Sequence, residues 1–235
     1  MKFATGAPLI FSLLLVPSLG SAATCENLFR AEPSKARNVT QDADDALVMS
    51  REIERFFSGK SVVSILGSSR IADPAILSLT QDIAQALGLR GHDVMTGGGP
   101  GIMDAANRGA RRVGAGSIGL ELVSPWARHP TDYIDQLFVF RDLQARKSVF
   151  MKFSRAWVVM PGGLGSLDEV FSIIGAIYSG QTPKRPVILV GSAFWSPLLQ
   201  YIQGTLVTTY GTAKPTDLDF VHVVETPEQV LKLIP

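Results

Sequence analysis

The sequence predicts an α/β fold in which one parallel sheet is covered by helices on both faces. Three observations support this prediction: short apolar runs alternate with helical patterns, glycine-rich turns follow three of the runs, and the composition allows a large core. Strands of such a sheet are buried on both faces, which explains why they are nearly continuous apolar runs. Of the 235 residues, 46% are hydrophobic and 18% are charged, as in globular proteins rather than disordered ones.

The N-terminal part of the chain contributes one predicted helix before the alternation begins. Residues 25–40 look irregular, residues 42–58 place apolar side chains at helical spacing, and Gly59 ends that helix. The next predicted helix has clear start signals, because Asp73 is a suitable N-cap and Pro74 suits the first helical position.

Strands and helices then alternate to the end of the sequence. The predicted strands are 61–66, 92–96, 117–122, 137–140, 156–160, 186–190 and 220–224. The predicted helices between and after them are 74–87, 102–113, 143–153, 170–178, 194–206 and 227–234. In such a fold, ligands bind beyond the carboxyl ends of the strands, so functional residues are expected in the loops that follow them.

Glycine follows three of the strands, at Gly67, in the run 97–101 and in the run 162–165. The carboxyl ends of parallel strands lie at one edge of the sheet, so these three loops are expected to converge. Glycine lets the backbone approach a ligand closely, and the free N–H groups of a following helix attract anions. The convergence favours a phosphate or nucleotide, whereas each loop alone could be a tight turn without a ligand, and the G-x-G-x-x-G dinucleotide fingerprint is absent.

Glu169 lies one turn into the helix behind the third glycine loop, beside the expected phosphate. The spacing from Ser166 to Glu169 also matches the capping box S-x-x-E, in which Glu169 would have only a structural use. Arg146 and Lys147 form a basic pair in the preceding predicted helix. Such a pair usually lies at the surface, but a guanidinium fork also suits a phosphate or a carboxylate.

Other kinds of site find no support in the sequence. The three histidines, His92, His129 and His222, lack metal-ligand spacing, so no metal site is predicted. Cys25 is the only cysteine, which excludes an intrachain disulfide. The net charge is +1, from 22 basic and 21 acidic residues without a long block of like charge, so nucleic acid is not an expected partner.

Residues 1–23 have the pattern of a secretory signal peptide, with Lys2, an apolar stretch at 9–16 and small residues at 21–23. The apolar stretch is too short to span a bilayer comfortably. An exported protein, periplasmic or secreted, is therefore expected, without stable membrane insertion after cleavage. A cytoplasmic protein, an uncleaved N-terminal anchor and a lipid-modified Cys25 are the alternatives.

Four segments together resemble the LOG ("Lonely Guy") proteins in their longer bacterial version. Residues 161–169, PGGLGSLDE, resemble the family motif P-G-G-x-G-T-x-x-E, and the segment that begins at Arg146 resembles the element R-K-x-x-M. Residues 97–107 resemble the second glycine segment of the family, and residues 67–69 match the end of its first strand.

The resemblance covers about residues 61–206 and implies a Rossmann-like, three-layer fold. The expected organisation is a signal peptide at 1–23, an N-terminal extension with one helix at 24–60, and a Rossmann-like LOG domain at 61–235.

The resemblance implies a phosphoribohydrolase, which cleaves the N-glycosidic bond of a nucleoside 5′-monophosphate such as AMP or a cytokinin riboside monophosphate. The products are a free base and ribose 5-phosphate. Arg146 and Glu169 would be the catalytic pair, since a carboxylate can stabilise the positive charge that develops on the ribose. The implied substrate-binding residues are Gly67, Ser68, Gly98, Gly99, Lys147, Gly162, Gly163, Gly165 and Ser166.

The resemblance further implies a homodimer or larger homo-oligomer and no cofactor. Relatives are often labelled lysine decarboxylases, but the sequence offers no cofactor-bound lysine to support that label. Ser166 stands where the family motif has Thr, and Gly175 where relatives commonly have Thr. The alternative on the same fold is a non-catalytic protein that binds a nucleotide or a phosphorylated cofactor such as molybdenum cofactor, because a fold does not fix an activity. Retention of Arg146 and Glu169 favours the enzyme.

Overall fold

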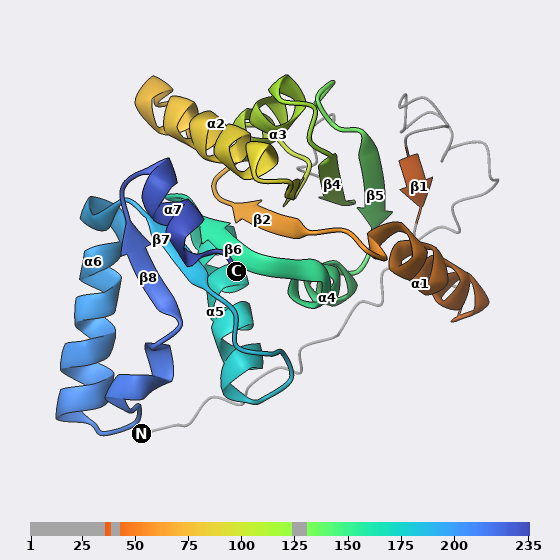
Figure 1. Ribbon diagram of the computed structural model, residues 1–235. Coiled ribbons are helices and arrows are strands. Elements are labelled where there is room, and N and C mark those ends of the chain that lie inside the picture. The colour runs from red at the N-terminus through yellow and green to blue at the C-terminus, as the bar shows by residue number, and fades with distance from the viewer. Residues whose placement is uncertain (1–35, 39–42, 124–130) are drawn as a thin grey trace, which may run out of the picture. The chain divides into compact units, whose positions relative to one another are not determined.

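The computed structural model describes residues 36–38, 43–123 and 131–235, and it has the predicted α/β architecture (Figure 1). Eight strands form one sheet in the order β1-β5-β4-β3-β2-β6-β7-β8, and every neighbouring pair is parallel. The strands are β1 Ala36–Asn38, β2 Val62–Leu66, β3 Asp93–Thr96, β4 Ser117–Leu122, β5 Gln136–Phe140, β6 Ser154–Val159, β7 Val187–Val190 and β8 Val221–Val224. The predicted fold class is confirmed.

Helices cover both faces of the sheet. They are α1 Ala43–Phe57, α2 Pro74–Leu89, α3 Ile102–Arg112, α4 Leu143–Phe153, α5 Leu164–Tyr178, α6 Ser192–Tyr201 and α7 Pro227–Leu233, with a π-helix η3 at Ile202–Thr209 and a 3-10 turn η4 at Pro215–Leu218. Side chains of α2, α3 and α7 belong to one hydrophobic core, and those of α1, α4, α5 and α6 belong to the other. Figure 1 shows α2 and α3 on one side of the sheet and α4 and α5 on the other.

Alternation along the central strands explains why there are two cores. In β6, Trp157 and Val159 belong to the core beneath α4 and α5, while Ala156 and Val158 belong to the core beneath α2 and α3. All four side chains are fully buried. Successive side chains of a strand point to opposite faces, so a strand covered on both faces must be apolar at every position.

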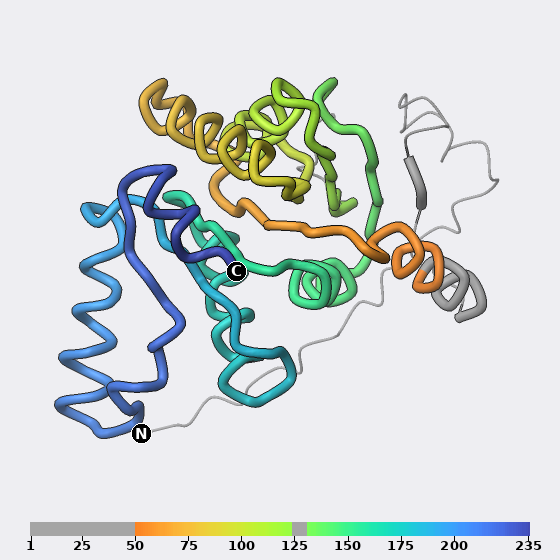
Figure 2. Tube along the Cα trace, viewed as in Figure 1, coloured from red at the N-terminus to blue at the C-terminus, as the bar shows by residue number. Residues whose placement is uncertain are grey.

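The order in which strands are added to the sheet reverses at β2. The chain runs from β2 through β3 and β4 to β5, then returns through α4 to β6, which pairs with the other side of β2 (Figure 2). The helices that follow β2 and β6 therefore cover opposite faces of the sheet. A crevice forms at such a topological switch point, beyond the carboxyl ends of the two strands, and ligands of α/β proteins bind there.

Two parts of the predicted secondary structure were wrong. Residues 36–38, expected to be irregular, form β1 and pair with β5 at the sheet edge, where Ala36 is opposite Leu137. Three residues carry no periodicity, so only the non-local pairing reveals the strand. Helix α5 begins at Leu164, whereas the apolar pattern suggested a start at Val170, because its first turn contains glycine and polar residues.

The proposed signal peptide and Cys25 lie outside the described residues, and the domain boundaries remain predictions. None of the helices in the described part of the chain has the length and apolar character that a bilayer-spanning segment needs. Helix α1 packs on the sheet through Ile53 and Phe57, and the Phe57 ring stacks on Phe153 at 4.4 Å between centroids.

We predict opposite effects of alanine at two helical glycines. A Cβ atom at Gly109 in α3 would lie 2.8 Å from the Cβ of Ala84 in α2 and closer still to the carbonyl oxygen of Gln81, whereas Gly175 in α5 has open space around it. Gly109→Ala should lower the free energy of unfolding by about 1–3 kcal/mol through overpacking. Gly175→Ala should raise it by about 0.5–1 kcal/mol, because glycine weakens a helix interior.

Chemical denaturation of both variants and the wild type would measure these changes. Each variant is the control for the other, since both add one methyl group to a helix. No stability loss in Gly109→Ala would contradict the close packing of α3 on α2, and a loss in Gly175→Ala would contradict the open space around α5 at that position.

Candidate active site

The three glycine loops converge at the switch point, as the sequence predicted. Their strands β3, β2 and β6 are neighbours in the sheet. The backbone N–H of Ser68 donates to the carbonyl oxygen of Pro161 (3.3 Å), and the N–H of Ile102 donates to the carbonyl oxygen of Ser68 (3.2 Å). The loop after β2 therefore lies between the other two loops and is hydrogen-bonded to both.

Two glycines make this contact possible. A Cβ atom at Gly67 would lie 2.7 Å from the Ile102 side chain, and one at Gly101 would lie 2.7 Å from the carbonyl oxygen of Ser68. Gly101 also has a φ of 68°, in the left-handed region that favours glycine. These glycines allow the loops to pack closely together. A role of Gly67 and Ser68 in substrate binding stays a prediction.

The start of α5 offers the clearest anion site. Gly163 is the N-cap of this helix and supplies no side-chain hydrogen bond. The first N–H groups of a helix have no partner within it, and they carry the positive end of its dipole. A Cβ atom at Gly163 or Gly165 would meet nothing within 4 Å, so these amides are open to an approaching phosphate.

The capping-box interpretation of Ser166 and Glu169 was wrong. Because α5 begins at Leu164, both residues lie inside the helix and neither caps it. Ser166 is buried against Gly162, where a Cβ atom would clash with the Ser166 hydroxyl. The side chain of Glu169 is thus free to take part in a different interaction.

Glu169 instead forms an ion pair with Arg146 of α4. The Arg146 Nη1 and Glu169 Oε1 atoms are 3.6 Å apart, and the two side chains are only 12% and 15% exposed. The orientation of Arg146 is fixed by a second contact, because its Nε donates to the carbonyl oxygen of Leu120 in β4 (2.7 Å). Its guanidinium also lies over Gly97, where a Cβ atom would clash with Nη2.

Burial controls the ionisation of this pair. It raises the pKa of the Glu169 carboxyl above its ordinary value, and the positive charge of Arg146 opposes that rise. Burial also lowers the pKa of Arg146, with Glu169 and Glu121 acting in the opposite direction. A carboxylate whose pKa is raised in a cleft is a candidate for general acid or base chemistry.

Lys147 faces α5 rather than the glycine loops. Its buried Nζ lies 2.5 Å from Asp168 Oδ2 and 3.1 Å from the Ser172 hydroxyl. Asp168 is half-exposed, so the pair links α4 to the rim of the site. A role of Lys147 in substrate binding stays a prediction.

A buried polar network supports the second glycine loop. The Thr96 hydroxyl donates to Asn107 Oδ1 (2.7 Å), Asn107 Nδ2 donates to the Ser117 hydroxyl (2.8 Å), and the Gly98 N–H donates to the Thr96 hydroxyl (3.0 Å). The sequence left the direction of Asn107 open, and the structure turns it toward β3 and β4. Since the Gly98 amide is already bonded, substrate contacts of Gly98 and Gly99 stay predictions.

Sequence reasoning missed several contributors to the site. Gly97 gives space to the guanidinium, the Leu120 carbonyl orients it, and Glu121 is a buried carboxylate near it. Gly97 lies in a run that the sequence had marked for ligand binding, so its steric use was hidden. A backbone carbonyl leaves no sequence signal.

Within the described ranges, no cluster of three or more His, Cys, Asp or Glu residues could hold a metal ion.

A cavity of about 410 Å³ opens beside the loops, between α2 and α3. Gly101, Asp104 and Arg108 are among its lining residues. Asp104 lies in the first turn of α3, where it favours the helix dipole, and its Oδ2 accepts from Arg108 Nη2 at 2.9 Å. This cavity adjoins the loops without including the Arg146–Glu169 pair.

Known proteins of two activities resemble the chain in sequence. It is 28% identical over 187 residues to the cytokinin riboside 5′-monophosphate phosphoribohydrolase of Mycobacterium tuberculosis, covering 78% of this chain and 97% of that protein. It is 26% identical over 139 residues to the pyrimidine/purine nucleotide 5′-monophosphate nucleosidase of Escherichia coli K12. That match covers 55% of this chain but only 31% of the longer E. coli protein.

Solved structures share the fold. The molybdenum cofactor binding protein of Rippkaea orientalis superposes with a TM-score of 0.57 at 23% identity, covering 74% of this chain and 94% of that one. At this identity the likeness concerns the fold alone.

The family model described as "Possible lysine decarboxylase" matches residues 103–234, more than half of the chain. This span includes Arg146, Lys147 and the whole loop from Pro161 to Glu169. Together with the phosphoribohydrolase relatives, the match establishes what the motifs suggested: the chain belongs to the LOG family, whose family model carries the lysine decarboxylase description.

Proposed function

We propose that this protein hydrolyses the N-glycosidic bond of a nucleoside 5′-monophosphate and releases a free base and ribose 5-phosphate. The observation that carries the proposal is the buried Arg146–Glu169 pair, one turn away from the uncapped start of α5. An anion site and a carboxylate with a raised pKa are thus only one helical turn apart.

The 5′-phosphate would bind the N–H groups at the start of α5, over the open faces of Gly163 and Gly165. With the phosphate anchored, the ribose reaches toward Glu169, and the reacting groups are held in one place. Breaking the bond between ribose and base develops positive charge at C1′. The Glu169 carboxylate would stabilise that charge or activate the attacking water, and Arg146 would orient Glu169.

Relatives support the class of substrate. The M. tuberculosis protein is named for a cytokinin riboside 5′-monophosphate and the E. coli protein for pyrimidine and purine nucleotide 5′-monophosphates. A nucleoside 5′-monophosphate is common to both names. AMP is therefore the first substrate to test, with a cytokinin riboside monophosphate second.

A non-catalytic carrier on the same fold is not favoured. A protein that only binds a nucleotide gains nothing from burying a carboxylate against a guanidinium, because removing both charges from water costs free energy. The resemblance to a molybdenum cofactor binding protein is one of fold and offers no residue-level support. We further propose export of the mature protein and assembly as a homo-oligomer, on the N-terminal sequence pattern and the family resemblance.

Glu169→Gln is the direct test of the reaction. The amide keeps the size of the side chain but can neither stabilise positive charge nor accept a proton, so kcat for release of adenine from AMP should fall by about 10²–10⁴-fold. Free base can be followed by chromatography, and AMP binding by calorimetry. Unchanged release by Glu169→Gln, or no release by the wild type from any nucleoside monophosphate, would contradict the proposal.

Gly163→Asp should separate phosphate binding from folding. Gly163 has a φ of −93° and open space, so aspartate fits there and is a good N-cap, stabilising α5 by a few tenths of a kcal/mol. Its negative charge would occupy the phosphate site and raise the KM for AMP at least about tenfold, since like charges brought together cost several kcal/mol.

Gly163→Asn is the matched control, because asparagine caps a helix equally well without the charge. Thermal unfolding should show both variants at least as stable as the wild type, and only the aspartate should weaken AMP strongly. Equal KM values for the two variants would exclude a phosphate at the start of α5.

Asp168→Asn should shift the pH dependence of the reaction. The negative charge of Asp168 raises the pKa of Glu169, while the positive charge of Lys147 lowers it. Removing the Asp168 charge leaves Lys147 unopposed, so the pKa of Glu169 should fall. If the ionised Glu169 is the active form, activity is lost as the pH drops through this pKa, and the variant should keep activity to a lower pH than the wild type.

Profiles of kcat/KM against pH for the two proteins give the comparison. The AMP phosphate also titrates, with a pKa of about 6, but it does so equally in both experiments. Activity that is lost as the pH rises through this pKa, rather than as it falls, would mean that the protonated Glu169 is the active form. A profile that moves to higher pH in Asp168→Asn would contradict the electrostatic effect of Asp168 on Glu169.

A further inference from the structure

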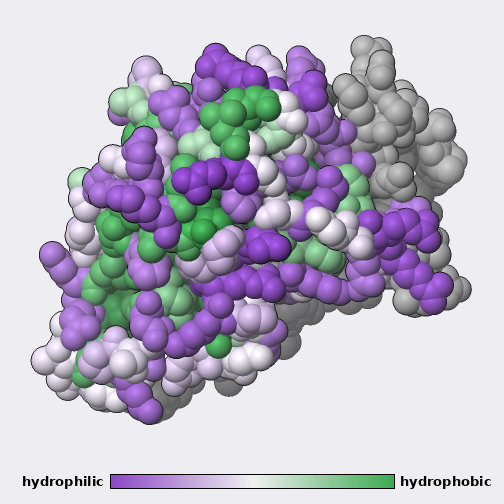
Figure 3. Space-filling view, viewed as in Figure 1, coloured by the Kyte–Doolittle hydropathy of each residue, from purple (hydrophilic) through white to green (hydrophobic). Residues whose placement is uncertain are grey.

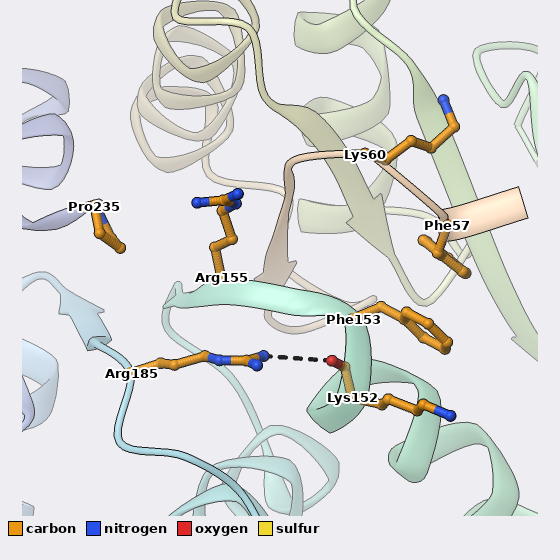
Figure 4. A pocket seen from close by; sticks show the side chains of 7 residues that line it. All are labelled: Phe57, Lys60, Lys152, Phe153, Arg155, Arg185 and Pro235. Carbon is orange, nitrogen blue, oxygen red and sulfur yellow. Dashed lines mark hydrogen bonds between the residues drawn. The ribbon is translucent and has the colours of Figure 1, made fainter. Parts of the chain in front are cut away.

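A second cavity lies near the N-terminal ends of the central strands, whereas the glycine loops follow the carboxyl ends. It has a volume of about 370 Å³, within the range of small-ligand sites. The residues that line it come from the C-terminal ends of α1 and α4, from the beginning of β6, from the segments just before β2 and β7, and from the segment after α7 (Figure 4): Phe57, Lys60, Lys152, Phe153, Arg155, Arg185 and Pro235. The face of the molecule drawn in Figure 3 carries many hydrophilic side chains, with hydrophobic ones among them.

Four of the lining side chains are cationic, but only two of them have acidic partners. Lys60 Nζ lies 2.9 Å from Asp93 Oδ2, and Lys152 Nζ lies 2.5 Å from Glu54 Oε1. Across the described ranges, no carboxylate lies within ion-pair distance of Arg155 or Arg185. Within those ranges the guanidinium groups of Arg155 and Arg185 are therefore not paired with any aspartate or glutamate side chain.

A β-bulge presents Arg155 to this cavity. In the pairing of β2 with β6, Val62 is opposite Ser154 and Val63 is opposite Ala156, so Arg155 is the extra residue. Bulges in parallel sheets are rare, and they redirect a side chain out of the normal alternation. Arg155 is consequently exposed beside a strand whose next four residues are fully buried.

Arg185 is held in place by the backbone of the α4–β6 junction. Its Nη1 donates to the carbonyl oxygens of Met151 (3.5 Å), Lys152 (3.4 Å) and Ser154. These bonds use one nitrogen of the guanidinium. The other two nitrogens make no hydrogen bond to the residues that the structure describes, which leaves them for a ligand.

The positive potential extends to a neighbouring histidine. Partial burial, Arg155 and Arg90 lower the pKa of His92 from its ordinary value. On its other side the His92 Nδ1 atom is 2.8 Å from the Ser61 hydroxyl. Arg90 and Arg155 thus both contribute positive potential at His92.

We propose that this cavity, hereafter the basic cavity, binds a small phosphate-bearing anion at a site separate from the active site. Two guanidinium groups without acidic partners match the two negative charges of a phosphate, and their forked donors suit its oxygens. The stacked rings of Phe57 and Phe153 form one wall, which restricts the depth available to the ligand. Isolated surface arginines are common, but Arg155 and Arg185 line a cavity, Arg155 lies in a β-bulge, and backbone carbonyl groups hold Arg185 in place.

Inorganic pyrophosphate is the probe, and Gly163→Asp is the background in which to test it, because that change is expected to block phosphate at α5. Calorimetry should show one bound pyrophosphate per chain. Adding Arg155→Gln should weaken this binding at least about tenfold, while Arg155→Lys should restore part of it. Arg155 is exposed and makes no protein hydrogen bond in the described part of the chain, so its replacement should leave the fold intact.

Arg112→Gln is the matched control, since Arg112 is an exposed arginine at the end of α3, outside the basic cavity. Affinity unchanged by Arg112→Gln but lost in Arg155→Gln supports the site. Equal losses in both variants, no pyrophosphate bound in the Gly163→Asp background, or Arg155-dependent binding only to vesicles containing phosphatidylserine would overturn it. None of these readouts requires hydrolysis, so failure of the proposed reaction would be seen separately.

Discussion

The buried ion pair between Arg146 and Glu169 is the interaction on which the arrangement of the site depends. Bringing a guanidinium and a carboxylate out of water costs free energy that a pair 3.6 Å apart recovers only in part. The surrounding structure compensates: a β4 carbonyl orients the guanidinium, a glycine gives it space, and α5 presents the carboxylate. Such a pair contributes little to stability, so its presence at the switch point is best explained by chemistry.

The sequence was a good guide to whatever depends on local pattern and on parallel topology. Buried strands such as 156–160 and helices such as 143–153 stood out because their apolar residues alone determine where they pack. The convergence of the loops at Gly67, Gly97 and Gly162 followed from one geometrical rule, that parallel strands end at the same edge. Arg146 and Glu169 were found through motif resemblance, and the structure brings them together.

Features that depend on tertiary contacts could not be predicted in this way. The spacing of Ser166 and Glu169 fits a capping box, but the N-cap of α5 is Gly163, so the helix starts too early for Ser166 to be its cap. Lys147 follows Arg146 directly, yet the helix turns it toward Asp168, and no local pattern specifies that direction. Strand β1 and the bulge at Arg155 exist only through pairing with distant strands. For Lys147, β1 and the bulge, the deciding partner lies far away in the chain.

The run of glycines at 97–99 shows how a ligand-binding motif can be built from unrelated steric demands. Gly97 makes way for the Arg146 guanidinium, Gly98 takes a φ of 76° above Gly119, and Gly99 makes way for the methyl end of Met103. The three glycines are thus required by different neighbouring groups. A relative with a shorter side chain at position 103 could have a larger residue at position 99, whereas one that retains an arginine at 146 must keep glycine at 97. Substitutions within the motif would then indicate which neighbouring side chain has changed.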